Sequence, residues 1–217
     1  MFPARALTVA MAAGALLTSV LPAASMTTSH IATDAELVEI LPTPSFVAEG
    51  RIGDLGGAAT FELDLGASTA APDQMAQYDW PNGVPVPLTL SHDGVGTVTF
   101  TVGDVSLFYV PLIDFEDIFI RTRAVETDTH ILVDELVLDS AIVGDFSEAT
   151  GSGGLDILRI TDIDIAGGFV LTGEVTFSWV GDHPRNSRLA FQIMVGEPDD
   201  IVPTEVATWG RVKDLFR

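Results

Sequence analysis

The sequence predicts an all-β protein, an antiparallel β-sandwich of the jelly-roll kind with about ten strands. Apolar residues alternate or run continuously over short stretches, and Gly, Asp, Asn and Pro residues separate those stretches. No helical period of apolar residues appears before the C-terminal end of the chain. The 217 residues are enough for one domain with a sizeable core.

About ten stretches have the composition of β-strands. They are residues 45–52, 60–65, 86–92, 97–102, 106–110, 118–125, 131–138, 155–160, 169–180 and 188–195. Turn-forming residues separate them, as at His92-Asp93-Gly94. The stretch 117–139 is predicted to be a β-hairpin, because two apolar runs flank the short polar segment 126–129.

Residues 1–25 are predicted to be a signal peptide. Arg5 precedes an apolar run over 6–21, and Ala23 and Ser25 then suit the small-residue positions of a cleavage site. The run has about 16 residues, fewer than the roughly 20 that a spanning helix needs. We therefore expect a secreted or cell-surface protein whose mature chain begins near Met26 and has no transmembrane span.

The mature chain is expected to have four parts. Residues 26–44 lead into the sandwich, and residues 45–196 form it. Residues 197–208 are an acidic linker, and residues 209–217 are a short basic amphipathic tail.

The chain is strongly acidic, with 31 Asp and Glu against 10 Lys and Arg and a net charge of −21. This balance excludes nucleic acid as a default partner, because phosphate-binding surfaces need clustered Arg and Lys. An anionic membrane surface would repel it as well. The charge indicates a solvated surface or, alternatively, specific cation binding. There are no cysteines, so packing, alone or with a metal, must hold the exported fold.

The segment 78–83, Tyr-Asp-Trp-Pro-Asn-Gly, is the first candidate binding site. Tyr78 and Trp80 could stack on a sugar ring, while Asp79 and Asn82 could hydrogen-bond its hydroxyl groups. The same residues also suit a packed corner, because aromatic side chains before a Pro-Asn-Gly turn can fill the end of a sandwich core.

Acidic residues around the stretch 117–139 are a candidate site for Ca²⁺, which prefers carboxylate and other oxygen ligands. The residues are Asp114, Glu116, Asp117, Asp134, Glu135 and Asp139. Alternatively, Arg121 and Arg123 pair with these carboxylates across the ladder. A third candidate is the segment 182–188, in which His183, Arg185 and Arg188 could bind a carboxylate or phosphate, or form a plain hairpin loop.

No catalytic motif is found: the chain lacks GxSxG, HExxH, a P-loop and a cysteine nucleophile. Glu62 and Asp64 lie two residues apart in a predicted strand and so share one face. Such a carboxylate pair could serve glycoside cleavage, although acidic residues on an exposed strand face need no catalytic explanation.

Several blocks resemble the choice-of-anchor W domain. They include Phe61-Glu-Leu-Asp-Leu-Gly66, the segment 78–83, Asp117-Ile-Phe-Ile-Arg-Thr-Arg-Ala124, Leu171-Thr-Gly-Glu-Val-Thr-Phe-Ser-Trp179 and Ser187-Arg-Leu-Ala-Phe-Gln-Ile193. The blocks follow in order over residues 45–196. The resemblance implies a secreted bacterial β-domain with variable C-terminal anchors, often of the PEP-CTERM type, and it brings no catalytic residues.

The C-terminal end departs from that family pattern. Val202-Pro-Thr-Glu205 is not followed by the apolar span and basic cluster of a PEP-CTERM tail. Apolar and basic residues instead recur at near-helical spacing: Trp209, Arg211, Val212, Lys213, Leu215, Phe216 and Arg217. This tail could dock on an export or sorting component, a neighbouring subunit or the acidic body itself.

The sequence therefore predicts a secreted or cell-surface β-sandwich without enzymatic activity, with a role in adhesion, matrix or surface contact. Its expected partners are an extracellular glycan or a surface or matrix protein. A carbohydrate-binding module, with or without structural calcium, is the alternative, and a glycoside hydrolase is a more remote one.

Overall fold

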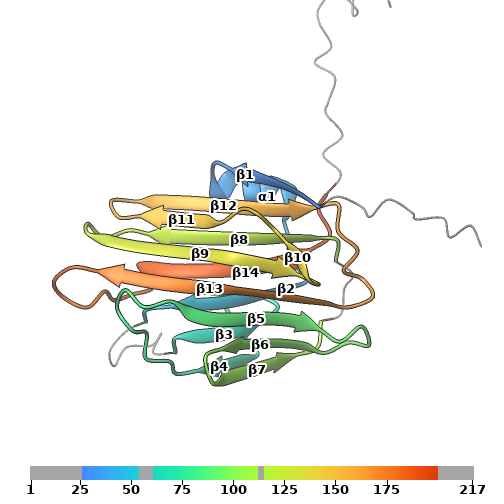
Figure 1. The fold of residues 1–217 in the computed structure, drawn as a ribbon, viewed down its shortest axis with the longest axis horizontal. Coiled ribbons are helices and arrows are strands. Elements are labelled where there is room, and N and C mark those ends of the chain that lie inside the picture. Colours follow the sequence, from blue (N-terminus) through green and yellow to red (C-terminus); the bar gives the residue numbers. More distant parts are fainter. Residues whose placement is uncertain (1–25, 54–60, 112–114, 200–217) are drawn as a thin grey trace, which may run out of the picture.

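The protein is a sandwich of two antiparallel sheets (Figure 1). The computed structural model describes residues 26–53, 61–111 and 115–199. Alternate residues of most strands point between the sheets, and the resulting core takes side chains from both. The predicted all-β antiparallel sandwich is thereby confirmed.

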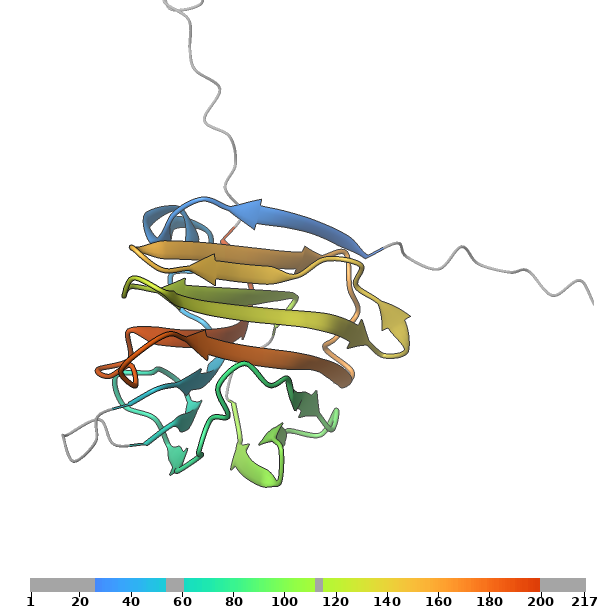
Figure 2. The same cartoon turned by 60° about the vertical axis from the view of Figure 1, so that its left-hand side comes forward.

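The first sheet contains strands from both ends of the chain. Its order is β1 (Thr27–Ile31), β12 (Gly154–Thr161), β8 (Asp117–Ala124), β14 (Leu189–Gly196), β2 (Phe46–Arg51), β3 (Leu63–Gly66) and β4 (Gln74–Ala76). Figure 2 shows β1, drawn in blue, along the edge of this sheet beside β12. Strand β14 lies between β8 and β2, so the last strand of the fold occupies an interior position.

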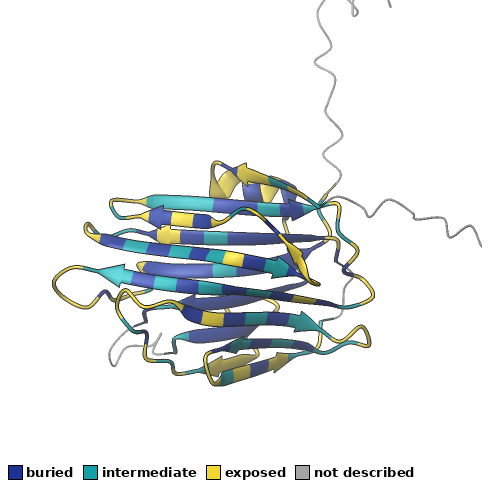
Figure 3. Ribbon diagram, in the orientation of Figure 1, coloured by how far each residue is buried: buried dark blue, intermediate teal, exposed yellow. Residues whose placement is uncertain are grey.

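The second sheet is a seven-stranded layer. Its order is β10 (Ala141–Ile142), β9 (Thr129–Leu138), β13 (Phe169–Trp179), β5 (Val86–His92), β6 (Val98–Val102) and β7 (Val105–Tyr109), and β11 (Ser147–Thr150) also pairs with β9. Buried and more exposed residues alternate along β9, β13 and β5 (Figure 3). This alternation is expected where one face of a sheet packs on a core and the other meets solvent.

The predicted hairpin over 117–139 is wrong. Its two strands, β8 and β9, belong to different sheets, and the segment between them crosses from one layer to the other. At one end of the crossing Val125 N–H donates to the Arg188 carbonyl beside β14, and at the other Val180 N–H donates to the Asp128 carbonyl. The apolar patterns of both strands were correct, but they do not say which sheet each strand joins.

Residues 26–44, expected to be a lead-in, contribute β1 and a helix to the fold. Helix α1 (Asp34–Ile40) begins after Thr33, whose hydroxyl accepts a hydrogen bond from Glu36 N–H at 3.1 Å. Its apolar side packs on the outer face of the first sheet against residues such as Phe119 and Met194. Among the described residues, no helix is long and apolar enough to span a membrane.

Helix α1 also supplies the partner of Arg121. The Nε and Nη2 atoms of Arg121 donate to the two carboxylate oxygens of Asp34 at 2.7 and 2.8 Å. This bidentate pair ties the helix to β8. Arg121 therefore pairs with Asp34 of helix α1 and not with the acidic residues in or beside the stretch 117–139.

Candidate ligand-binding pocket

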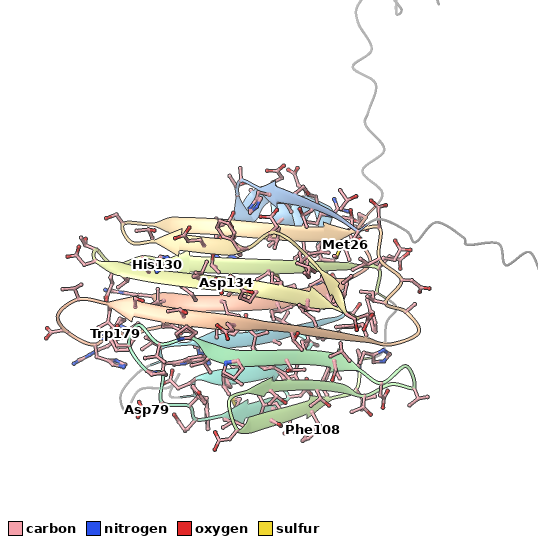
Figure 4. All side chains as sticks on the ribbon, in the orientation of Figure 1. Met26, Asp79, Phe108, His130, Asp134 and Trp179 are labelled. Atoms are coloured by element: carbon pink, nitrogen blue, oxygen red, sulfur yellow. The ribbon has the colours of Figure 1, made fainter. Side chains whose placement is uncertain are left out.

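Two of the segments singled out in the sequence meet at one cavity of about 290 Å³. The cavity lies where the connection from β4 to β5 meets the ends of β2 and β3 and the connection from β13 to β14. Its lining residues are Ile52, Glu62, Gln77, Tyr78, Asp79, Trp80 and His183. Figure 4 labels Asp79 and Trp179, which lie at the same end of the sandwich.

Trp80 forms part of the core beneath the pocket. The residue is only 5 % exposed, and its ring centroid lies 4.3 Å from that of Phe177 and 6.2 Å from that of Phe191. The indole N–H donates to the Arg51 carbonyl oxygen at 2.9 Å, which satisfies the one polar group of the buried ring. The prediction that Trp80 belongs to an exposed sugar-stacking platform is therefore wrong, and the packed-corner alternative holds for this residue.

Tyr78 is the aromatic residue that remains partly open at the pocket. Its ring meets Trp80 edge-on, with 4.6 Å between centroids, and its hydroxyl end lies over Gly103 in the turn between β6 and β7. Burial raises the pKa of the Tyr78 phenol, and the carboxylates of Asp104 and Asp79 raise it further. The ring is thus a fixed wall in a negative electrostatic environment.

Asn82 holds the pocket loop to β13. Its amide nitrogen donates to the Trp179 carbonyl at 2.9 Å, and its amide oxygen accepts from Trp179 N–H at 3.0 Å. Both hydrogen-bonding ends of the side chain are thereby used within the fold. The predicted ligand-binding role of Asn82 is replaced by a positioning role, because the side chain fixes the loop beside the β13–β14 connection.

Glu62 and Asp79 give the pocket its negative charge. One oxygen of the half-buried Glu62 carboxylate accepts from Gly53 N–H at 2.7 Å. Burial raises the pKa of Glu62, and nearby Asp79 adds to the rise, although the bond from Gly53 and the charges of Arg51 and His183 oppose it. Asp79 itself is exposed at the rim.

The arginine nearest to Glu62 is already occupied. Arg51 places Nη2 2.6 Å from the buried Asp64 carboxylate and Nη1 3.5 Å from the buried Glu49 carboxylate. Asp64 is only 2 % exposed and pairs with Arg51, whereas Glu62 faces the pocket. The Glu62 and Asp64 pair considered for glycoside cleavage is therefore not assembled at one site.

His183 closes the pocket from the β13–β14 connection. Its Nδ1 lies 2.9 Å from the Pro184 carbonyl oxygen and donates to it, because a carbonyl can only accept. The ring also packs at 4.9 Å from the Trp179 ring. In the neutral imidazole this arrangement leaves Nε2 as an acceptor for a ligand.

The anion-binding role considered for the segment 182–188 finds little support. Arg188 pairs with Glu126, with Nη1 2.8 Å from the carboxylate oxygen, and Arg185 is exposed and does not line the cavity. Of this segment only His183 lies at the pocket. The chain instead places the carboxylates of Glu62 and Asp79 at the pocket.

The predicted calcium ligands belong to two different sheets. Asp117 begins β8 in the first sheet, and its carboxylate accepts from Arg159 Nε at 2.7 Å. Asp139 follows β9 in the second sheet and accepts from Val170 N–H at 2.8 Å. Both carboxylates thus have protein partners.

The remaining members of the calcium set do not complete a site. Asp134 lies along β9, away from the end that carries Asp79 (Figure 4), and Glu116 is exposed next to Asp117. Asp114 is outside the described residues. Over the ranges that the structure describes, no group of three or more His, Asp or Glu side chains is placed to hold a metal ion. The described members of this set therefore form no calcium site by themselves.

Sequence reasoning identified Tyr78 and Asp79 but missed Glu62 and His183 as their neighbours. Glu62 and His183 are far apart in sequence, and no local pattern relates them. The only signal was that the segments 78–83 and 182–188 both carry residues suited to binding. The predicted tail, Trp209 to Arg217, lies outside the described residues.

No family model and no curated protein sequence matches the chain.

Proposed function

We propose that this chain is a secreted or cell-surface β-sandwich that acts by binding, and that its pocket holds one unit of an extracellular glycan. The observation that carries the proposal is the meeting of Tyr78, Gln77, Asp79, Glu62 and His183 at one cavity. An aromatic wall beside carboxylate, amide and imidazole groups is the combination that recognises a ring bearing hydroxyl groups.

The size of the cavity supports a single sugar unit. About 290 Å³ lies at the lower end of the range for small-molecule pockets, where one ring fits and a long oligosaccharide does not. The leader-like N-terminus and the resemblance to the choice-of-anchor W domain support an extracellular setting. In that setting such a pocket would attach the protein to a matrix or a cell surface.

Titration of the mature chain with soluble oligosaccharides tests the proposal. Tetramers of glucose, mannose, galactose, N-acetylglucosamine and glucosamine are the probes, and calorimetry reports binding. We expect saturable binding of at least one probe, weakened about tenfold or more by Tyr78→Ala or Glu62→Gln, as expected when a wall or a hydrogen-bonding group of the site is removed.

Asp182→Asn is the matched control, because Asp182 is exposed beside His183 but does not line the cavity. Its affinity should equal that of the unmodified chain. Saturable binding of none of the probes would overturn the proposal. Shortened oligosaccharides in the mixture, detected by mass spectrometry, would overturn the non-enzymatic part of it.

A further inference from the structure

We infer that the sugar unit held by this pocket carries a positive charge, so that the ligand is an amino sugar whose ammonium group binds between Glu62 and Asp79. The inference rests on the binding function proposed above and names the class of its ligand. It follows from the charges that line the cavity, the environment of Glu62 and the aromatic wall.

The described residues that line the cavity include two carboxylates and no lysine or arginine. Arg51 is committed to Asp64 and Glu49 on the outer face of the first sheet, and Arg188 is committed to Glu126. The charges of Arg51 and His183 lower the pKa of Glu62 from nearby, but burial outweighs them, so among the described residues the two carboxylates still lack a directly bound positive charge. A bound ammonium group would supply that charge.

Glu62 gains most from such a ligand, because it is half-buried and its carboxylate accepts a backbone N–H from Gly53. A neutral sugar covering this carboxylate would remove water from a negative charge without compensating it. An ammonium group would form a charge-assisted hydrogen bond with it instead. The same group could reach Asp79 at the rim.

Tyr78 adds a second attraction for a cation. An aromatic ring face attracts ammonium groups and packs against the apolar face of a sugar ring. Burial is the main cause of the raised pKa of the Tyr78 phenol, and the carboxylates of Asp104 and Asp79 raise it further. The Tyr78 ring and the two carboxylates thus favour the same ligand, a sugar ring that has an apolar face and carries a positive charge.

The charge of the whole chain works in the same direction but cannot by itself place a ligand. A net charge of −21 attracts any cation and repels acidic glycans. Specific binding in the pocket must therefore be separated from general attraction to an acidic surface. The matched variants of the test make that separation.

The test compares two tetrasaccharides that differ only at nitrogen: the glucosamine tetramer, which carries ammonium groups at mildly acidic pH, and its fully N-acetylated, neutral counterpart. Calorimetry with the mature chain should show about tenfold tighter binding of the glucosamine tetramer, equal to about 1.4 kcal/mol. Asp79→Asn should reduce this preference, because it removes one of the two carboxylates that would hold the ammonium group, and its exposed position leaves the core intact.

Asp182→Asn removes one nearby surface charge and should leave the preference unchanged. Equal or tighter binding of the acetylated tetramer would overturn the inference while leaving the proposed function standing. A preference for glucosamine that Asp79→Asn and Asp182→Asn reduce equally would also overturn it, because general surface attraction would then account for the binding. If neither tetramer nor any other oligosaccharide binds, the proposed function itself is overturned.

Discussion

At the scale of single residues, His30 clamps the N-terminal strand to the sandwich. Its Nδ1 lies 2.7 Å from Asp156 of β12, and its Nε2 lies 3.3 Å from Asp145 of the segment between β10 and β11. Both ring nitrogens face carboxylate oxygens, so only the protonated ring can donate to both. Burial lowers the pKa of His30, but the hydrogen bonds and charges of Asp156 and Asp145 outweigh it, and the pKa is raised above 6.5.

Because His30 pairs with Asp156 and Asp145, we expect the free energy of unfolding to fall as the pH rises. A histidine whose pKa is raised in the folded state stabilises fully below its unfolded value near 6.5, and the contribution disappears as the pH passes through the raised value. The change should be at most about 1 kcal/mol, because the side chain is 43 % exposed and solvent screens the pairs.

Urea unfolding across this pH range measures the effect. His30→Gln should flatten the decline in unfolding free energy, whereas His183→Gln, at the pocket, should not. An unchanged pH profile in His30→Gln would show that the clamp contributes nothing.

At the scale of elements, the sequence predicted the long strands and missed the short ones. Each predicted strand from 45–52 to 188–195 has a counterpart, because each shows apolar alternation or a continuous apolar run. Strands β4 and β10 have three and two residues, too few to show a period. Strand β1 is mostly exposed and polar, so only its pairing with β12 defines it.

The hairpin error has a physical reason that is visible in the two strands themselves. Strand β8 is buried on both faces near its start, because α1 covers its outer face over Phe119, whereas β9 alternates between buried and more exposed residues. Strands with such different outer faces do not share a sheet surface here. The pocket was not predicted because the pairing of distant strands, which the sequence does not show, brings Glu62 and His183 to Tyr78.

The loop that carries Tyr78 and Asp79 should depend on its attachment to β13. Asn82→Ala removes both hydrogen bonds to the Trp179 backbone and should lower the free energy of unfolding by about 1–2 kcal/mol. Asn82→Asp keeps the acceptor for Trp179 N–H and should lose about half as much. Urea unfolding measures both values, and the alanine variant should also bind oligosaccharide more weakly. Equal stability of the alanine variant and the unmodified chain would contradict the positioning role of Asn82.

At the scale of the whole molecule, uncompensated negative charge opposes the folded state. The chain carries 31 acidic against 10 basic residues, so there are too few Lys and Arg side chains to pair with most of the carboxylates. Self-repulsion of this kind weakens as ionic strength rises, because the screening length falls from about 10 Å at 0.1 M to about 3 Å at 1 M salt.

We therefore expect sodium chloride to raise the melting temperature of the protein by several degrees, about 2–4 °C for each kcal/mol of relieved repulsion. Calorimetry at neutral pH measures this shift. The same titration near pH 4.1, the isoelectric point, should show little effect, because the net charge is then close to zero. A melting temperature that falls with salt at neutral pH would show that attractive ion pairs dominate instead.

The position of β14 between β8 and β2 governs when the molecule can fold. Strand β8 can pair with β12 and β2 with β3, but the two halves of the first sheet join only through β14, so the sheet cannot close until residue 196 has left the ribosome. Such non-local pairing gives a high contact order and slow folding, with unpaired strand edges exposed meanwhile. The chain therefore exposes unpaired strand edges until its last strand is added, and it needs protection against aggregation until then.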